Sequence, residues 1–171
     1  NNVKLYDRGP KAVRALLEDN NLKMPSGHVG WEAMQADPER AAATCREAGQ
    51  SFVVIPYWPE EKRTAEGYGE LVDILNQGGE ICKNYGLQLA YHNHDFEFQT
   101  MEGEVPMYYI LDNTEPDLLK MELDLYWITK AKFDVKDFFT KYSGRIPLWH
   151  VKDMGSDGKF ADVGSGSVDF K

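Results

Sequence analysis

Side chains that can bind a metal or transfer protons gather at the ends of three short apolar segments. The segments are residues 89–98 (LAYHNHDFEF), 120–127 (KMELDLYW) and 147–154 (PLWHVKDM). Imidazole nitrogen together with carboxylate oxygen suits Zn²⁺, Mn²⁺, Co²⁺ or Fe²⁺ better than Ca²⁺. Brought together, such groups would polarise a substrate and move its protons, so the pattern indicates an enzyme.

Groups of the same kind recur at regular intervals. His28 and Trp58 close two further strand-like segments, and the positions 28, 58, 94, 124 and 150 follow one another at steps of 30, 36, 30 and 26 residues. Each step is about the length of one βα unit. Side chains at the carboxyl ends of successive parallel strands form the active sites of α/β barrels and open α/β sheets.

Composition limits the classes of protein to consider. The chain has 171 residues, of which 42% are hydrophobic, which is enough for one domain over residues 1–171. A net charge of −9 argues against a nucleic-acid partner, and no segment is long and apolar enough for a membrane span. We expect a soluble protein, with a cytoplasmic location favoured. Because the chain begins with Asn1 rather than Met, processing or truncation is indicated and a periplasmic or secreted origin stays open.

Helix and strand patterns alternate along the chain. Apolar spacing and capping residues predict helices at residues 7–20, 37–49, 67–86, 105–113 and 134–142. Runs of β-branched and aromatic residues predict strands at residues 23–28, 51–58, 87–94, 118–127 and 146–154. The Gly78-Gly79 pair weakens the prediction of an unbroken third helix, and the polar, glycine-rich residues 155–171 are predicted to form a loop.

This alternation implies right-handed βαβ crossovers and a parallel sheet. About five or six βα units fit the chain, whereas a complete eight-stranded barrel typically needs about 250 residues. The predicted fold class is α/β, a parallel (β/α) barrel of the TIM type that is incomplete in this chain, with an open sheet as the alternative. An incomplete barrel leaves two strand edges without a partner.

The histidine-rich segment offers several candidate ligands. His92 and His94 share one side of the predicted strand, about 7 Å apart, because side chains alternate along a strand. Asp95 and Glu97 follow in the exit loop, where a carboxylate can act as ligand or base. The competing interpretation is a strand end with solvated charges and one hydrogen-bonded histidine. Four of the six residues from His92 to Glu97 are potential ligands or proton carriers, which favours a site.

Two carboxylates share one face of the next predicted strand. Glu122 and Asp124 lie inside an apolar run, where an ionised carboxyl group must be paired, hydrogen-bonded or bound to a metal. Asp124 is nearer the carboxyl end and is the better ligand candidate, whereas Glu122 could instead pair with a lysine lower in the structure. On the following strand His150 and Lys152 share a face by the same period.

Aromatic residues offer weaker signals. Trp58 and Trp127, together with Trp31 and Tyr126, could form a floor under a sugar ring, although aromatic residues in strands more often belong to the core. His28 either hydrogen-bonds a substrate or caps a loop.

The segments YHNHDFEF, ELDLYW, HVKDM and DVGSGSVDFK resemble the successive signatures of the sugar phosphate isomerase/epimerase family, whose fold is the xylose-isomerase-like TIM barrel. The resemblance extends from about residue 26 to residue 170. It implies one divalent metal ion, one of Mn, Zn, Co, Fe or Mg, at the carboxyl-terminal mouth of the barrel. It also implies ligands from a glutamate, an aspartate, a histidine and a second glutamate. The aspartate matches Asp124 and the histidine matches His150.

This sequence departs from the family pattern in two places. Where many relatives have the first glutamate, this chain has His92, so the resemblance leaves His92, His94 or Glu97 as the remaining ligand. The second glutamate belongs to a last strand that this chain does not reach, and residues 163–166 read VGSG where relatives often read VGEG. The resemblance also implies a first strand before Asn1, so that the chain corresponds to about strands two to six.

Together, the residues and the resemblance predict a metal-dependent sugar isomerase or epimerase that removes a proton next to a carbonyl and passes through an enediolate. The predicted metal ligands are Asp124, His150 and His92; the predicted catalytic groups are Glu97, His94 and Lys152; the predicted substrate contacts are His28, Trp58 and Trp127. A dehydratase or lyase would share the first step, and a non-catalytic sugar-binding module is the alternative from another class. A DNA-repair endonuclease of the same fold is disfavoured by the acidic charge. The expected partner is a sugar or sugar derivative, and a homo-oligomer is compatible with these features.

Overall fold

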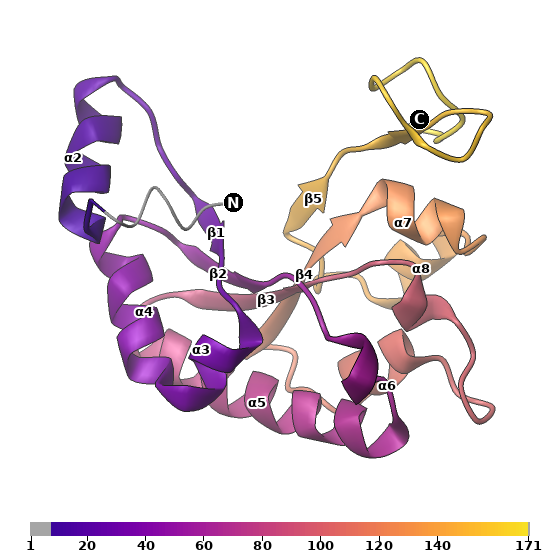
Figure 1. The fold of residues 1–171 in the computed structure, drawn as a ribbon, viewed down its shortest axis with the longest axis horizontal. Helices are drawn as coiled ribbons and strands as arrows, with labels where there is room; N and C mark the ends of the chain where they lie inside the picture. The colour runs from indigo at the N-terminus through magenta and orange to yellow at the C-terminus, as the bar shows by residue number, and fades with distance from the viewer. Residues whose placement is uncertain (1–7, 171) are drawn as a thin grey trace.

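Five short parallel strands form one curled sheet in the computed structural model, which describes residues 8–170. In spatial order they are β1 (Ser26–His28), β2 (Phe52–Ile55), β3 (Gln88–His92), β4 (Leu119–Asp124) and β5 (Leu148–His150). The spatial order equals the chain order, as in a barrel built from successive βα units. Figure 1 shows the sheet curling into a half-barrel with an open concave side. The prediction of an incomplete parallel barrel is confirmed.

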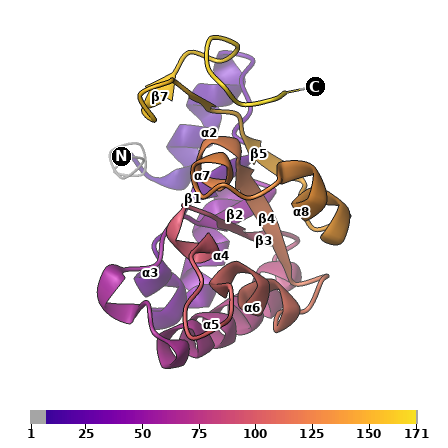
Figure 2. The ribbon, with the colours of Figure 1, turned by 90° about the vertical axis from the view of Figure 1, so that its right-hand side faces the viewer.

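Helices connect the strands and lie mainly on the convex side of the sheet (Figure 1, Figure 2). The helices are α2 (Pro10–Asp19), α3 (Trp31–Ala36), α4 (Pro38–Glu47), α5 (Ala65–Asn84), α6 (Pro106–Asp112), α7 (Leu125–Lys130) and α8 (Val135–Lys141), with the 3-10 turns η1 (Glu60–Lys62) and η2 (Phe96–Phe98). All five predicted helices are present, and α3 and α7 are additional. No helix in the described part of the chain is long and apolar enough to cross a membrane.

Two predicted helix starts have the expected caps. The Asp37 carboxylate accepts a hydrogen bond of 3.0 Å from the Arg40 backbone N–H, and Pro38 occupies the first helical position of α4. The Asp134 carboxylate accepts a hydrogen bond of 2.9 Å from the Asp137 N–H at the start of α8. These caps satisfy N–H groups that have no partner inside the helix.

The Gly78-Gly79 pair does not break α5, which runs unbroken from Ala65 to Asn84. A Cβ atom at Gly78 would lie 2.9 Å from the Met34 sulfur, and one at Gly79 would lie 2.8 Å from the Leu118 Cβ. Both approaches are too close for real side chains. The pair therefore lets α5 pack tightly against its neighbours, and this close packing explains two glycines inside a helix.

The strand predicted for residues 118–127 ends early, at Asp124. The Asp124 carboxylate accepts a hydrogen bond of 3.1 Å from the Trp127 backbone N–H and thereby caps α7. The prediction that Tyr126 and Trp127 belong to the strand is wrong, because this capping aspartate starts a helix inside an apolar run.

The loop predicted for residues 155–171 is partly wrong, since β6 (Asp153–Met154) and β7 (Phe160–Ala161) form a small antiparallel hairpin. The Asp153 carboxylate organises the segment that follows. It accepts hydrogen bonds of 2.8 to 3.0 Å from the backbone N–H groups of Met154, Gly164, Gly166 and Val168. Burial alone raises the pKa of the Asp153 carboxyl, but these four donors outweigh it and lower the pKa.

Candidate functional site

Parallel pairing brings the predicted ligands to one end of the sheet. In the strand register His92 lies beside Glu122, and Asp124 lies beside His150. Since alternate residues of a strand point to the same side, Glu122 and Asp124 both reach the imidazoles. His28, the last residue of β1, joins them across the curled sheet, with its Nε2 2.8 Å from Glu122 Oε1. Residues 94 positions apart thus meet in one cluster.

Glu122 lies at the centre of three imidazoles. Its Oε1 is 2.8 Å from His28 Nε2, 3.0 Å from His150 Nε2 and 3.4 Å from His92 Nδ1, and its side chain is only 5% exposed. Burial alone raises the pKa of the Glu122 carboxyl, but the imidazoles of His28 and His92 outweigh it and hold the pKa at about 2. The alternative of a lysine partner for Glu122 is wrong within residues 8–170, where its ionic partners are histidines.

Asp124 has a different environment. Its Oδ2 is 2.6 Å from Lys152 Nζ, 3.5 Å from His150 Nδ1 and 3.8 Å from His92 Nε2. The side chain is fully buried. Burial alone raises the pKa of the Asp124 carboxyl, but His150 and Lys152 hold it below its usual range. The prediction that His150 and Lys152 share a face is confirmed, since both reach Asp124.

His94 lies at the edge of this cluster, among aromatic rings. Its ring centroid is 5.1 Å from that of His92 and 5.1 Å from that of Trp127, and its ring stacks on Phe96 at 5.6 Å. Burial, with the nearby His92, lowers the pKa of His94 to about 4. His94 is therefore neutral at neutral pH and able to accept a proton.

The cluster contains two overlapping sets of atoms that fit a divalent metal ion. His92, Asp124 and His150 each offer one ligand atom, all within 4.8 Å of one another, and His28, Glu122 and His150 do the same. In the described part of the chain, the buried Nδ1 atoms of His92 and His150 have no hydrogen-bond partner. A buried polar atom without a partner is costly, and coordination would satisfy it. Mixed nitrogen and oxygen donors suit Zn²⁺, Mn²⁺, Co²⁺ or Fe²⁺.

Glu97 lies next to the cluster, and both of its carboxylate oxygens accept hydrogen bonds. It is fully buried in η2, where it accepts hydrogen bonds from the Tyr91 hydroxyl (2.8 Å) and the His94 backbone N–H (2.7 Å). Burial raises the pKa of the Glu97 carboxyl to about 7. The predicted exit loop instead turns into a 3-10 helix after β3, which folds the Glu97 side chain inward. Its observed contacts hold the backbone at His94.

Trp58 is fully buried and offers no surface to a substrate, so the structure contradicts its prediction as a substrate contact. Its indole N–H donates a hydrogen bond of 2.9 Å to the Lys62 carbonyl, and its ring packs edge-on against Trp31 at 5.1 Å. The reason is that β2 ends at Ile55, so the strand period no longer applies at position 58. Trp127 is half-buried beside His94 and keeps its predicted position near the site.

Sequence patterns did not single out Tyr57 and Arg63, which lie near His94 and Phe96. Tyr57 is 43% exposed, and its ring lies 5.5 Å from that of His94. Arg63 donates a hydrogen bond of 2.7 Å to the Tyr57 hydroxyl, and its guanidinium lies 3.4 Å from the Phe96 ring centroid. The sequence feature that could have pointed to Tyr57 is its place directly before Trp58, in the segment that follows β2. Of these two adjacent aromatic residues, Trp58 is buried and Tyr57 is exposed.

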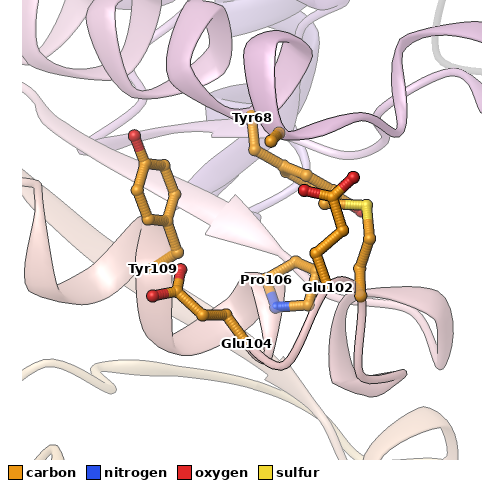
Figure 3. A pocket seen from close by; sticks show the side chains of 7 residues that line it. Tyr68, Glu102, Glu104, Pro106 and Tyr109 are labelled. Atoms are coloured by element: carbon orange, nitrogen blue, oxygen red, sulfur yellow. The ribbon is translucent and has the colours of Figure 1, made fainter.

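A separate pocket of about 220 Å³ lies between α5 and α6. Figure 3 shows Glu102 and Glu104, from the segment before α6, beside Tyr68 of α5 and Tyr109 of α6. None of the residues that line it is a histidine. It therefore lacks the nitrogen donors of the cluster at the strand ends.

A curled parallel sheet with histidine, carboxylate and lysine side chains gathered at the carboxyl ends of its strands is the arrangement of an α/β barrel. A family model described as "Xylose isomerase-like TIM barrel" matches residues 1–171. The chain belongs to this family, and the resemblance found from the sequence motifs is confirmed.

Similar proteins carry two kinds of name. An inosose dehydratase of Geobacillus kaustophilus is 22% identical over 210 aligned positions, which cover 98% of this chain and 67% of the relative. An inosose dehydratase of Halalkalibacterium halodurans is 30% identical over 118 positions, which cover 58% of this chain and 38% of the relative. Among solved structures, a sugar phosphate isomerase/epimerase of Parabacteroides distasonis has a TM-score of 0.78 and 27% identity, covering 91% of this chain and 60% of that one. This chain thus spans less than two thirds of that structure.

The IOLI protein, solved with a zinc atom, has a TM-score of 0.74 and 16% identity, covering 92% of this chain and 65% of that one. At this level of identity the likeness shows the shared fold.

Proposed function

We propose that this chain belongs to a metal-dependent enzyme that removes a proton next to the carbonyl of a polyhydroxylated, sugar-like ketone, and that loss of water follows. The observation that carries the proposal is the convergence of His92, Asp124 and His150, whose ligand atoms lie within 4.8 Å of one another at the strand ends. Mixed imidazole and carboxylate donors at this place in the fold support a catalytic metal centre.

His92, Asp124 and His150 would hold the ion. When bound, a divalent ion would polarise the substrate carbonyl oxygen and acidify the neighbouring C–H bond. The ionised Asp124 contributes negative charge, and burial lowers the pKa of His92, which keeps this imidazole neutral and available as a ligand.

His94 and Lys152 would move the protons. The His94 imidazole, whose ring centroid lies 5.1 Å from those of His92 and Trp127, accepts the proton from carbon; burial lowers its pKa to about 4 and so keeps it unprotonated. Lys152, held 2.6 Å from Asp124, donates a proton to the departing hydroxyl, which leaves as water. The half-buried Trp127 beside His94 offers an apolar face for the substrate ring, and the partly exposed His28 offers a hydrogen bond. Glu97 supports the His94 backbone in this proposal.

Isomerisation or epimerisation is the second candidate outcome. It shares the proton removal but ends with return of the proton to carbon instead of loss of water. The neighbour named sugar phosphate isomerase/epimerase supports it. The relatives named inosose dehydratase, together with a lysine placed to act as an acid, favour loss of water.

The test is a screen of cyclic and open-chain polyhydroxylated ketones in D₂O, with the chain loaded with Mn²⁺, Co²⁺ or Zn²⁺. We expect the native chain to incorporate deuterium next to the carbonyl and to release water. Asp124→Asn should abolish both, whereas Lys152→Met should abolish only the loss of water, because His94 removes the proton from carbon. Deuterium incorporation without water loss would indicate the isomerase or epimerase outcome. A metal-loaded, folded chain that binds the ketones without any exchange would overturn the proposal in favour of a sugar-binding module.

A further inference from the structure

We propose a second divalent-cation position in this chain, centred on Glu122 and held by His28 Nε2, Glu122 Oε1 and His150 Nε2. It is separate from the position at Asp124 used in the proposed function. Glu122 precedes Asp124 by two residues in β4, so this position lies about 7 Å deeper along the strand. The three ligand atoms come from β1, β4 and β5 and lie within 4.8 Å of one another.

The two carboxylates differ in their counter-charge. Asp124 has the Lys152 ammonium at 2.6 Å as a permanent counter-charge. Within residues 8–170, the only ionisable partners of Glu122 at ion-pair distance are the imidazoles of His28, His92 and His150. The side chain of Glu122 is 95% buried and its ion-pair partners are imidazoles, so it lacks a permanent cation. A divalent cation is the counter-charge that imidazole and carboxylate donors together select.

Glu122 also lies closer to its imidazole nitrogens than Asp124 does. Its Oε1 lies 2.8 Å from His28 Nε2 and 3.0 Å from His150 Nε2, whereas Asp124 Oδ2 lies 3.5 Å and 3.8 Å from its imidazole nitrogens. Ligand atoms about 2.0–2.2 Å from a common metal are themselves about 3 Å or more apart, so small shifts would admit an ion. His28 is 32% exposed on its side chain, which gives the ion a path from solvent.

His150 can serve both positions because its two ring nitrogens face different carboxylates. Its Nε2 faces Glu122 and its Nδ1 faces Asp124. An ion at Glu122 would link β1 directly to β4 and β5 across the open side of the half-barrel. The deeper ion therefore has a structural effect that does not depend on turnover.

The experiment measures bound metal by mass spectrometry and thermal unfolding with Zn²⁺ or Mn²⁺ alone, in the full chain. We expect Asp124→Asn, and its combination with Lys152→Met, to retain about one equivalent of metal. Their unfolding temperature should rise by roughly 5–10 °C at a free metal concentration about 100 times the Kd. Adding Glu122→Gln or His28→Asn to Asp124→Asn should abolish both the bound metal and the rise.

Failure of this inference is distinguishable from failure of the proposed function. Loss of all metal in Asp124→Asn and in Asp124→Asn/Lys152→Met, with circular dichroism unchanged, would overturn the second position while leaving the Asp124 position intact. Retention of the full wild-type metal content in Glu122→Gln and in His28→Asn would overturn it as well. Neither result depends on any sugar being turned over, and His28→Asn changes a side chain that is 32% exposed.

Discussion

The Lys152 ammonium lies 2.6 Å from Asp124 Oδ2, the oxygen that also faces the nitrogens of His92 and His150. A fixed positive charge at this oxygen competes with a divalent ion for the same carboxylate. We expect Lys152→Met to tighten metal binding at Asp124 by roughly threefold to tenfold, a modest factor because Lys152 is partly exposed. Calorimetric titration with Zn²⁺ in a Glu122→Gln background would measure this position alone.

Lys136→Met is the matched control for this prediction, since Lys136 pairs with Asp169 on the surface and is 72% exposed. It should leave the Zn²⁺ affinity unchanged. Weaker binding in Lys152→Met would mean that Lys152 supports the metal site instead of competing with it.

Glu97 should make stability fall as pH rises. Its pKa is raised from 4.5 to about 7 by burial, so the folded chain holds a proton that the unfolded chain releases. The favourable contribution is complete below about pH 4.5 and is lost as pH rises through about 7. Gln mimics the protonated acid, so Glu97→Gln should leave stability unchanged near pH 4 and raise it by up to about 3 kcal/mol near pH 8.

Urea unfolding of the metal-free chain at several pH values measures this difference. Glu104→Gln changes an exposed carboxylate and should show no such pH-dependent gain. Equal stability differences for Glu97→Gln at pH 4 and pH 8 would show that Glu97 has an ordinary pKa in the folded chain.

The sequence predicted those contacts of the cluster that follow from the two-residue period of a strand. It did not predict the contacts that depend on the curl of the sheet or on a turn. His150 is the last residue of β5, and Lys152, two residues beyond it, also reaches Asp124, as the alternation of side chains predicted. The pairing of His28 with Glu122 depends on the curl of the sheet, which joins strands that are not neighbours and leaves no local signal.

Trp58 and Glu97 both have side chains whose direction the strand pattern did not predict. Both follow the end of a strand, at Ile55 and His92 respectively, and the chain turns there. A period of two predicts the direction of a side chain only while the backbone stays extended. The overall class of fold was predictable because it depends on the order of elements, which strong helix caps and apolar runs define.

Asp153 should control the order of the segment after β6. Its carboxylate accepts hydrogen bonds from four backbone N–H groups, three of them at Gly164, Gly166 and Val168. We expect Asp153→Ala to increase hydrogen exchange at these three amides by at least tenfold, since each loses its acceptor. Asp157→Ala, which removes an exposed carboxylate that contacts only its own turn, is the control and should leave the three amides protected. Unchanged exchange in Asp153→Ala would show that the hairpin orders the segment without it.

Two glycines of α5 should respond in opposite ways to the same substitution. A Cβ at Gly79 would lie 2.8 Å from the Leu118 Cβ and 2.9 Å from the Leu118 carbonyl oxygen, so Gly79→Ala should destabilise the chain by about 1–3 kcal/mol. A Cβ at Gly69 would have Tyr109 Oη at 3.8 Å as its nearest contact, so Gly69→Ala should stabilise the chain by about 0.5–1 kcal/mol through helix propensity. Urea unfolding of both variants measures the contrast. Stabilisation by Gly79→Ala would contradict the close packing of α5 against Leu118, because an added methyl group gains stability only where it has room.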